Sequence, residues 1–167
     1  MAMGGRSRLR SPEPDEYRLL RRAGPGGRIL ILVTPEQISL VEATLEDGSL
    51  DLDTVAADFY RRLFTADPGT AEMFSGDPDV QRRRFAAELE AICRAIRRHP
   101  DFLAGARALG ARHRRYGVEA AHYRTAGPPL LGALATALGD RWTPEVAESW
   151  RLAYRLTVEA MTMGDAS

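Results

Sequence analysis

The sequence predicts an all-α protein. From Thr34 onward, apolar residues recur every three or four positions, a spacing that places them on one face of a helix. Short segments rich in glycine, proline and aspartate separate these apolar stripes, as is typical of turns between helices. No stretch alternates apolar and polar residues for long enough to predict a strand. We therefore expect about six helices joined by short turns.

The first predicted helix has a start signal and a stop signal. Thr34 stands at the N-cap position, Pro35 at the first helical position, and Gln37 can close a capping box. The dipeptide Asp47-Gly48 then ends the helix. Its apolar stripe consists of Ile38, Val41 and Leu45.

Three further stripes follow along the chain, and each ends at a turn signal. The second consists of Leu52, Val55, Phe59 and Leu63, and ends near Asp67-Pro68-Gly69. The third consists of Phe85, Leu89, Ile92 and Ile96, and ends before His99-Pro100. The fourth consists of Phe102, Ala106, Leu109 and His113, and ends at Gly117. Their spacing predicts three amphipathic helices.

The last two helices are less regular. One carries Leu130, Leu131, Leu134 and Leu138 and is closed by Gly139-Asp140. The final helix opens at Thr143-Pro144-Glu145 and carries Val146, Trp150, Ala153 or Tyr154, and Met161. Pro128-Pro129 interrupts the fifth helix, because proline lacks an N–H and clashes with the preceding turn. Either a helix restarts at Pro128 or the helix bends there.

The chain of 167 residues fits one domain with an extension. Residues 1–28 hold seven arginines against three acidic residues, with many glycines and prolines and few large apolar side chains. Such a segment buries too little surface to offset its ordering entropy. We expect residues 1–33 to be a disordered N-terminal extension and residues 34–167 to form the domain. The alternative is a basic arm for an acidic partner or a membrane surface.

Composition excludes several functional classes. All 23 basic residues are arginine and they equal the 23 acidic residues, so there is no catalytic lysine and no general attraction to nucleic acid. Cys93 is the single cysteine, which excludes an internal disulfide and a thiolate-rich metal site. The longest aliphatic run, Ile29 to Val33, is too short to cross a bilayer, and no apolar signal core follows Met1. We expect a cytoplasmic protein without nucleic-acid or membrane partners.

Three polar side chains lie on or beside the apolar faces of different helices. His113 ends the fourth stripe, Gln81 lies one and two turns before Phe85 and Leu89, and Tyr60 follows Phe59. Packing could explain any one of them, since a buried polar group needs only one good partner. Together they indicate a polar spot inside an apolar cavity.

These residues occur in phrases that resemble the globin family, in particular bacterial haemoglobins and the globin domain of flavohaemoglobins. The resemblance covers about residues 34–163, and its parts occur in the family's order. The matching phrases are Phe59-Tyr60-Arg61-Arg62-Leu63-Phe64, Pro68, Phe74, Leu109-Gly110-Ala111-Arg112-His113, Gly117-Val118, Ala121-His122-Tyr123, Leu138-Gly139-Asp140, Trp150 and Tyr154.

The resemblance implies a haem pocket inside a globin-like fold of six to eight helices. His113 would be the proximal iron ligand, and Tyr60 and Gln81 would donate hydrogen bonds to the bound ligand on the distal side. Gln81 precedes His113 by 32 residues, as in the family, and Arg84 is the competing choice for the distal position. The remaining residues implied to contact the haem are Phe74, Phe85, Arg112 at the propionates, Val118 and Tyr154. On the proximal side, Tyr123 and Asp165 would match the family's tyrosine and carboxylate near the histidine.

The implied function is binding of dioxygen, and of nitric oxide, at ferrous haem b. No Cys-x-x-Cys-His phrase occurs, so the haem is expected to be noncovalent. The family also implies oxygen carriage or nitric oxide dioxygenation, for which we expect a separate flavin reductase. Two alternatives stay open: a haem-based gas or redox sensor, and a globin-shaped interaction domain without haem. We expect a monomer or a homodimer.

Overall fold

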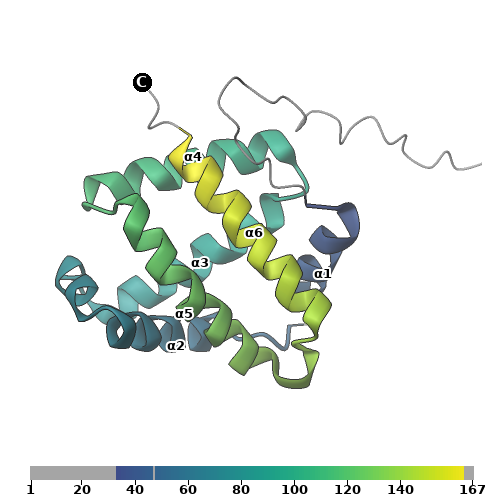
Figure 1. Cartoon of the computed structure of the whole chain (residues 1–167), viewed down its shortest axis with the longest axis horizontal. Helices are drawn as coiled ribbons and strands as arrows, with labels where there is room; N and C mark the ends of the chain where they lie inside the picture. Colours follow the sequence, from purple (N-terminus) through teal and green to yellow (C-terminus); the bar gives the residue numbers. More distant parts are fainter. Residues whose placement is uncertain (1–32, 47, 164–167) are drawn as a thin grey trace, which may run out of the picture. The chain divides into compact units, whose positions relative to one another are not determined.

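The computed structural model describes residues 33–46 and 48–163 (Figure 1). Over these ranges the chain forms six α-helices, two 3₁₀ helices and no strand, so the all-α prediction is confirmed. Apart from Val33, the expected extension lies outside the described residues, and so does Asp165. In chain order the elements are α1 (Pro35–Glu46), α2 (Leu52–Ala66), η2 (Pro68–Met73), α3 (Pro78–Ala95), α4 (His99–Arg115), α5 (Ala120–Leu138), η3 (Gly139–Arg141) and α6 (Pro144–Thr162).

The helix boundaries follow from local side-chain chemistry. The backbone N–H of Thr34 donates to Oε1 of Gln37 over 2.9 Å, and the N–H of Gln37 donates to Oγ1 of Thr34 over 3.3 Å. This is the predicted capping box at the start of α1. Asp77 caps α3, accepting from backbone N–H groups of the first turn. Gly117, with φ of 80°, ends the segment after α4 in a conformation that favours glycine.

The core lies where α2 and α6 meet their neighbours. Helix α2 packs against α5 and α3, whereas α6 packs against α4, α1 and α5, as Figure 1 shows for the adjacent α5 and α6. The indole Nε1 of Trp150 on α6 donates to Oγ1 of the buried Thr44 on α1 over 3.2 Å. Cys93 is fully inside this core, and burial raises the pKa of its thiol to about 12. It therefore acts as a small apolar residue.

Helices α4 and α6 cross at very close range. A Cβ placed on Gly110 would lie 2.2 Å from the carbonyl oxygen of Met161, so only glycine fits this crossing. One turn later, Nη1 of Arg114 donates to the same carbonyl oxygen over 3.2 Å. The end of α6 is thereby held against the helix that carries His113.

Helix α5 runs without interruption through Pro128 and Pro129. The alternative in which a helix restarts at Pro128 is therefore wrong. Since neither proline has an N–H, the carbonyls of Arg124 and Thr125 lack the usual donor four residues later. Pro129 is buried, so tertiary packing keeps the helix intact at this point.

Acidic neighbours partner several surface arginines. Arg94 pairs with Glu90 over 2.8 Å, and Arg98 pairs with Asp101 over 2.8 Å. These pairs are exposed, and such contacts stabilise a fold by at most about 1 kcal/mol each. Within residues 33–46 and 48–163, no helix is both long enough and apolar enough to span a bilayer.

Candidate functional site

The apolar stripes of α3 and α4 are fully covered at one end and only partly covered at the other. On α3, Ile92 is buried, whereas Phe85 and Leu89 stay partly exposed. On α4, Phe102 is fully buried, whereas Leu109 stays partly exposed. The covered ends are the C-terminal end of α3 and the N-terminal end of α4, which a short connection joins. The partly covered surface therefore lies at the opposite ends of the two helices.

An ion pair joins the two helices beside this partly covered surface. The guanidinium of Arg112 on α4 donates to the carboxylate of Glu88 on α3. Arg112, which we expected to contact a cofactor, is thus bonded across the two helices. Both side chains remain substantially exposed, so the pair can be remodelled at little cost in stability.

His113 lies at the partly exposed end of the α4 stripe. Its Nδ1 is 2.9 Å from the carbonyl oxygen of Leu109, one turn earlier, so Nδ1 carries the proton and donates it to that oxygen. Burial, together with the nearby charge of Arg112, lowers the pKa of His113 below 6.5, against the opposing effects of the Leu109 bond and of Glu88. The ring is therefore neutral at pH 7, and its Nε2 holds a lone pair. Within the described part of the chain, Nε2 has no hydrogen-bond partner.

Tyr60 and Gln81 contact each other across α2 and α3. The side-chain amide of Gln81 donates from Nε2 to the phenol oxygen of Tyr60 over 3.0 Å. Burial raises the pKa of Tyr60, and the phenol stays protonated at neutral pH. Because its oxygen accepts from Gln81, the O–H of Tyr60 is oriented to donate to a further acceptor. Arg84, the competing candidate for the Gln81 position, is exposed.

Aromatic rings surround the Tyr60 phenol. The centroids of Phe74, Phe85 and Phe64 lie 5.3, 5.6 and 5.7 Å from that of Tyr60. Phe85 also stacks on Phe59, with centroids 4.5 Å apart and ring planes 11° apart. These contacts fix the phenol in an apolar setting, in which a hydrogen bond from its O–H is strengthened.

A second group of residues lies around His113. The rings of His113 and Tyr123 are 6.0 Å apart with planes inclined by 30°. The hydroxyl of Tyr154 on α6 donates to the backbone carbonyl of Tyr123 on α5. Tyr154, expected to contact a cofactor, therefore directs its hydroxyl to the chain itself.

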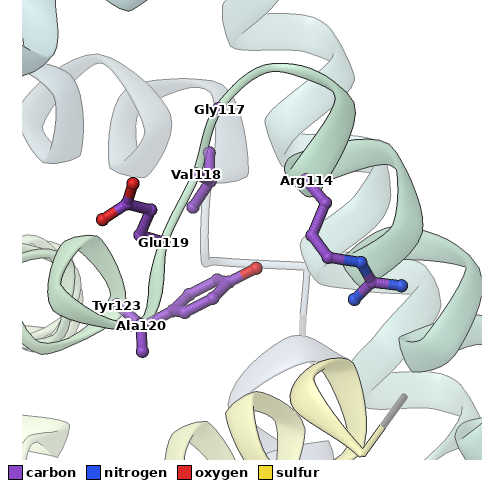
Figure 2. A pocket seen from close by; sticks show the side chains of 6 residues that line it. All are labelled: Arg114, Gly117, Val118, Glu119, Ala120 and Tyr123. Carbon is purple, nitrogen blue, oxygen red and sulfur yellow. The ribbon is translucent and has the colours of Figure 1, made fainter. Parts of the chain in front are cut away.

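A pocket of about 460 Å³ lies at the turn between α4 and α5 (Figure 2). The Tyr123 ring extends from the start of α5 toward the side of Arg114, and Val118 lies above it. The lining residues are Arg114, Gly117, Val118, Glu119, Ala120 and Tyr123. Another pocket, of about 490 Å³, lies beside the segment between α1 and α2 and is lined by Leu45, Gly48, Leu50, Asp51, Leu52, Asp53 and Glu90. Tyr60, Gln81 and His113 line neither of these two pockets.

The structure thus gathers the predicted site residues into two groups. The first contains Tyr60, Gln81, Phe74 and Phe85, and the second contains His113, Tyr123, Tyr154 and Val118. Sequence reasoning missed three partners of these groups: Glu88, and the carbonyls of Leu109 and Tyr123. The Leu109 contact could have been found, because a helical side chain commonly reaches the carbonyl four residues earlier.

His122 has a structural role at the start of α5. It belongs to one of the phrases that resemble the globin family, and it is partly buried in the first turn of α5. Its Nδ1 accepts the backbone N–H of Glu119 over 2.8 Å, which completes a reciprocal cap with the Glu119 side chain. The contact satisfies a terminal N–H group and fixes the start of α5.

Comparison with known proteins extends these observations. A globin family profile matches residues 57–161, which include every described site residue. A flavohemoprotein of Deinococcus radiodurans is 33% identical over 127 residues, covering 74% of this chain and 31% of the relative. Leghemoglobin of Medicago sativa is 26% identical over 132 residues, covering 72% of this chain and 90% of the relative. The chain spans about a third of the length of the flavohemoproteins that it matches.

A solved structure has a similar fold. It is an engineered carbene transferase derived from RmaNOD of Rhodothermus marinus, with a TM-score of 0.72 and 26% sequence identity. The match covers 80% of this chain and 94% of that protein. The expected globin-like arrangement of helices is thereby confirmed. Profile, relatives and fold agree that the chain belongs to the globin family.

Proposed function

We propose that this chain is a haem-b globin that binds dioxygen and nitric oxide at ferrous iron. The observation that carries the proposal is the state of His113. Its imidazole is neutral, its Nδ1–H is bonded to the Leu109 carbonyl, and its Nε2 lone pair is available. A neutral imidazole with one nitrogen so fixed is the usual axial ligand of haem iron.

The surroundings of His113 suit a metal ion whose other ligand atoms belong to a cofactor. In residues 33–46 and 48–163, no three histidine, cysteine, aspartate or glutamate side chains lie close enough to hold a metal ion. A porphyrin supplies the missing in-plane nitrogens and offers two broad apolar faces. Phe85, Leu89 and Leu109 leave apolar surface partly exposed in the same region, which suits such faces.

Bound haem would supply the ferrous iron to which the diatomic ligand attaches, and Tyr60 and Gln81 would act on that ligand. The O–H of Tyr60 would donate to a partly negative ligand atom, while the Gln81 amide donates to the phenol oxygen and holds it in place. The rings of Phe74 and Phe85 exclude water around the phenol, so the hydrogen bond acts in a low dielectric.

The remaining predicted residues have narrower proposed roles. Phe74 and Phe85 would contact the distal face of the haem, and Val118 and Tyr154 would limit its proximal side. Arg112 would exchange its exposed contact with Glu88 for a haem propionate. Asp165, outside the described residues, stays a prediction as a partner of Tyr123. Residues 34–167 would form the globin domain, with residues 1–33 as an extension.

We further propose nitric oxide detoxification with a separate flavin reductase as the physiological use of the site. The support is that relatives at 33% and 25% identity are flavohemoproteins and that the fold resembles a protein assigned to the nitric oxide dioxygenases.

The first test is the optical spectrum of the full chain with added haemin. We expect a Soret band that His113→Gly weakens or alters and that imidazole restores. His99→Gln is the matched control, because His99 is exposed at the start of α4 and its change should leave the spectrum unaltered. A chain that takes up no haem, or an unaltered spectrum in His113→Gly, contradicts the proposal.

The second test addresses the distal side. Tyr60→Phe removes one hydrogen bond to a charged ligand, worth about 1.5–3 kcal/mol, and should speed dioxygen dissociation on the order of ten- to hundredfold. Autoxidation should accelerate as well. Tyr116→Phe is the control, since Tyr116 is 70% exposed. An unchanged off-rate in Tyr60→Phe would mean that Tyr60 is not the distal donor.

A further inference from the structure

Tyr154 makes two contacts with the same segment of α5. Its ring packs on Gly127, where an added Cβ would lie 3.0 Å from Cε1 of the tyrosine. Its hydroxyl donates to the carbonyl oxygen of Tyr123, one turn earlier on α5. The two contacts hold a single turn of α5, residues 123–127, against α6.

This turn of α5 is the part that lacks backbone support. Pro128 and Pro129 deprive the carbonyls of Arg124 and Thr125 of their usual N–H donors. A helix that loses consecutive hydrogen bonds bends or opens unless an outside group holds it. The Tyr154 hydroxyl is such a group, and it acts one residue before the affected carbonyls.

The held turn carries the ring that faces His113. Tyr123 lies 6.0 Å from His113 between ring centroids, and both side chains are partly buried. The position of the Tyr123 ring depends on its own backbone, because the side chain is attached at the Cα next to the carbonyl group that Tyr154 holds. A change at Tyr154 is therefore expected to act on His113 through Tyr123.

We propose that Tyr154 is a positioning residue that sets the Tyr123 ring against His113 and compensates for the two prolines in α5. The inference rests on the proposed function only in the experiment that measures the bond between His113 and iron. Tyr154 acts through the α5 backbone, so its hydroxyl matters more than its ring. A Cβ at Gly127 would press on the Tyr154 ring, so Gly127→Ala should move that ring by a few tenths of an ångström.

The first experiment uses NMR on the full chain as purified, with labelled histidine and aromatic side chains. We expect a nuclear Overhauser cross-peak between the ring protons of His113 and Tyr123 in the wild type. Tyr154→Phe, which keeps the ring and removes the hydroxyl, should lose or strongly weaken this peak. Gly127→Ala should also weaken the cross-peak, because the added Cβ presses on the Tyr154 ring. Tyr116→Phe is the control: Tyr116 is the C-cap residue of α4 and is exposed, so losing its hydroxyl should leave the cross-peak unchanged.

The second experiment measures the resonance Raman band of the iron–histidine bond and the midpoint potential after addition of haemin. Tyr154→Phe should broaden and shift the band and change the potential relative to both wild type and Tyr116→Phe. A purely structural contact would lower the unfolding midpoint and leave the band of the folded protein unaltered. That result, or a His113–Tyr123 cross-peak that survives in Tyr154→Phe, overturns the inference.

The two proposals fail in different ways. If wild type takes up no haem, the proposed function falls, and the NMR experiment alone decides the role of Tyr154. If wild type binds haem through His113 but Tyr154→Phe matches it in both experiments, the proposed function stands and Tyr154 has no positioning role.

Discussion

Gly110 offers the sharpest test of the packing that supports His113. Gly110→Ala would place a Cβ 2.2 Å from the oxygen, 2.8 Å from the carbon and 2.9 Å from the Cα of Met161. All three atoms are backbone, so they cannot rotate away as a side-chain tip would. Helix α4 must instead separate from α6 by more than 1 Å to reach an ordinary contact of about 3.4 Å or more, and overpacking of this kind costs about 1–3 kcal/mol or more.

Gly105 is the matched control on the same helix. A Cβ at Gly105 would meet its nearest atom, Cδ1 of Ile92, at 3.7 Å, which is an ordinary contact. Gly105→Ala should therefore gain the helix-propensity difference of about 0.5–1 kcal/mol. The two variants make the same chemical change in one helix, so the propensity gain is common to both, and their unfolding free energies should differ by the overpacking cost of about 1–3 kcal/mol or more.

Urea unfolding followed by far-UV circular dichroism measures this difference. We expect the midpoint to fall for Gly110→Ala and to rise slightly for Gly105→Ala, with similar slopes for both. Because Gly110 lies between Leu109 and His113, Gly110→Ala should also weaken haem retention. Equal midpoints for the two variants would refute the close crossing of α4 and α6.

Two further substitutions test electrostatics and hydrogen bonding. The hydrogen bond from Arg62 holds the pKa of Asp58 below 3.8, so this carboxylate stabilises the fold above pH 3.8 and the contribution is lost as pH falls through the lowered pKa. Asp58→Asn should thus lower stability at neutral pH and flatten its acid dependence below pH 3.8, as measured by urea unfolding over that range. Thr44→Val removes the acceptor of the buried Trp150 indole N–H and should cost about 1–3 kcal/mol, whereas the exposed Thr65→Val should change little in thermal unfolding. Equal losses at the two threonines would mean that the indole bond contributes nothing.

Most of the fold could be predicted because its boundaries are set by short-range chemistry. Thr34 with Gln37, and the proline after Thr143, determine helix starts within a few residues of chain. The apolar spacing gives the buried faces by the same local geometry. Pro128 is the exception: local rules predict either a restart or a bend, and α5 continues because its buried residues pack between α2 and α6. Tertiary packing decides that case, and no local pattern encodes it.

The sequence predicts which residues form the site, but it does not predict which other residues they contact. Tyr60, Gln81 and His113 stand out as polar groups on or beside apolar faces, and two of them do contact each other. Contacts that join distant helices were not predictable, such as Arg112 with Glu88. Which acidic residue meets a given arginine depends on how helices cross, and exposed ion pairs leave no periodic signal in a sequence.

The two groups of site residues are supported in different ways, and this difference predicts how substitutions will behave. Tyr60 is held by the Gln81 side chain and by aromatic rings, so replacing its hydroxyl leaves the helix frame intact. Around His113, by contrast, the supporting acceptors are backbone carbonyls of three helices, contacted by His113, Arg114 and Tyr154. Changes there shift the helices themselves. Distal variants should therefore alter ligand dissociation at constant stability, whereas proximal variants should alter the iron–histidine bond and the unfolding free energy together.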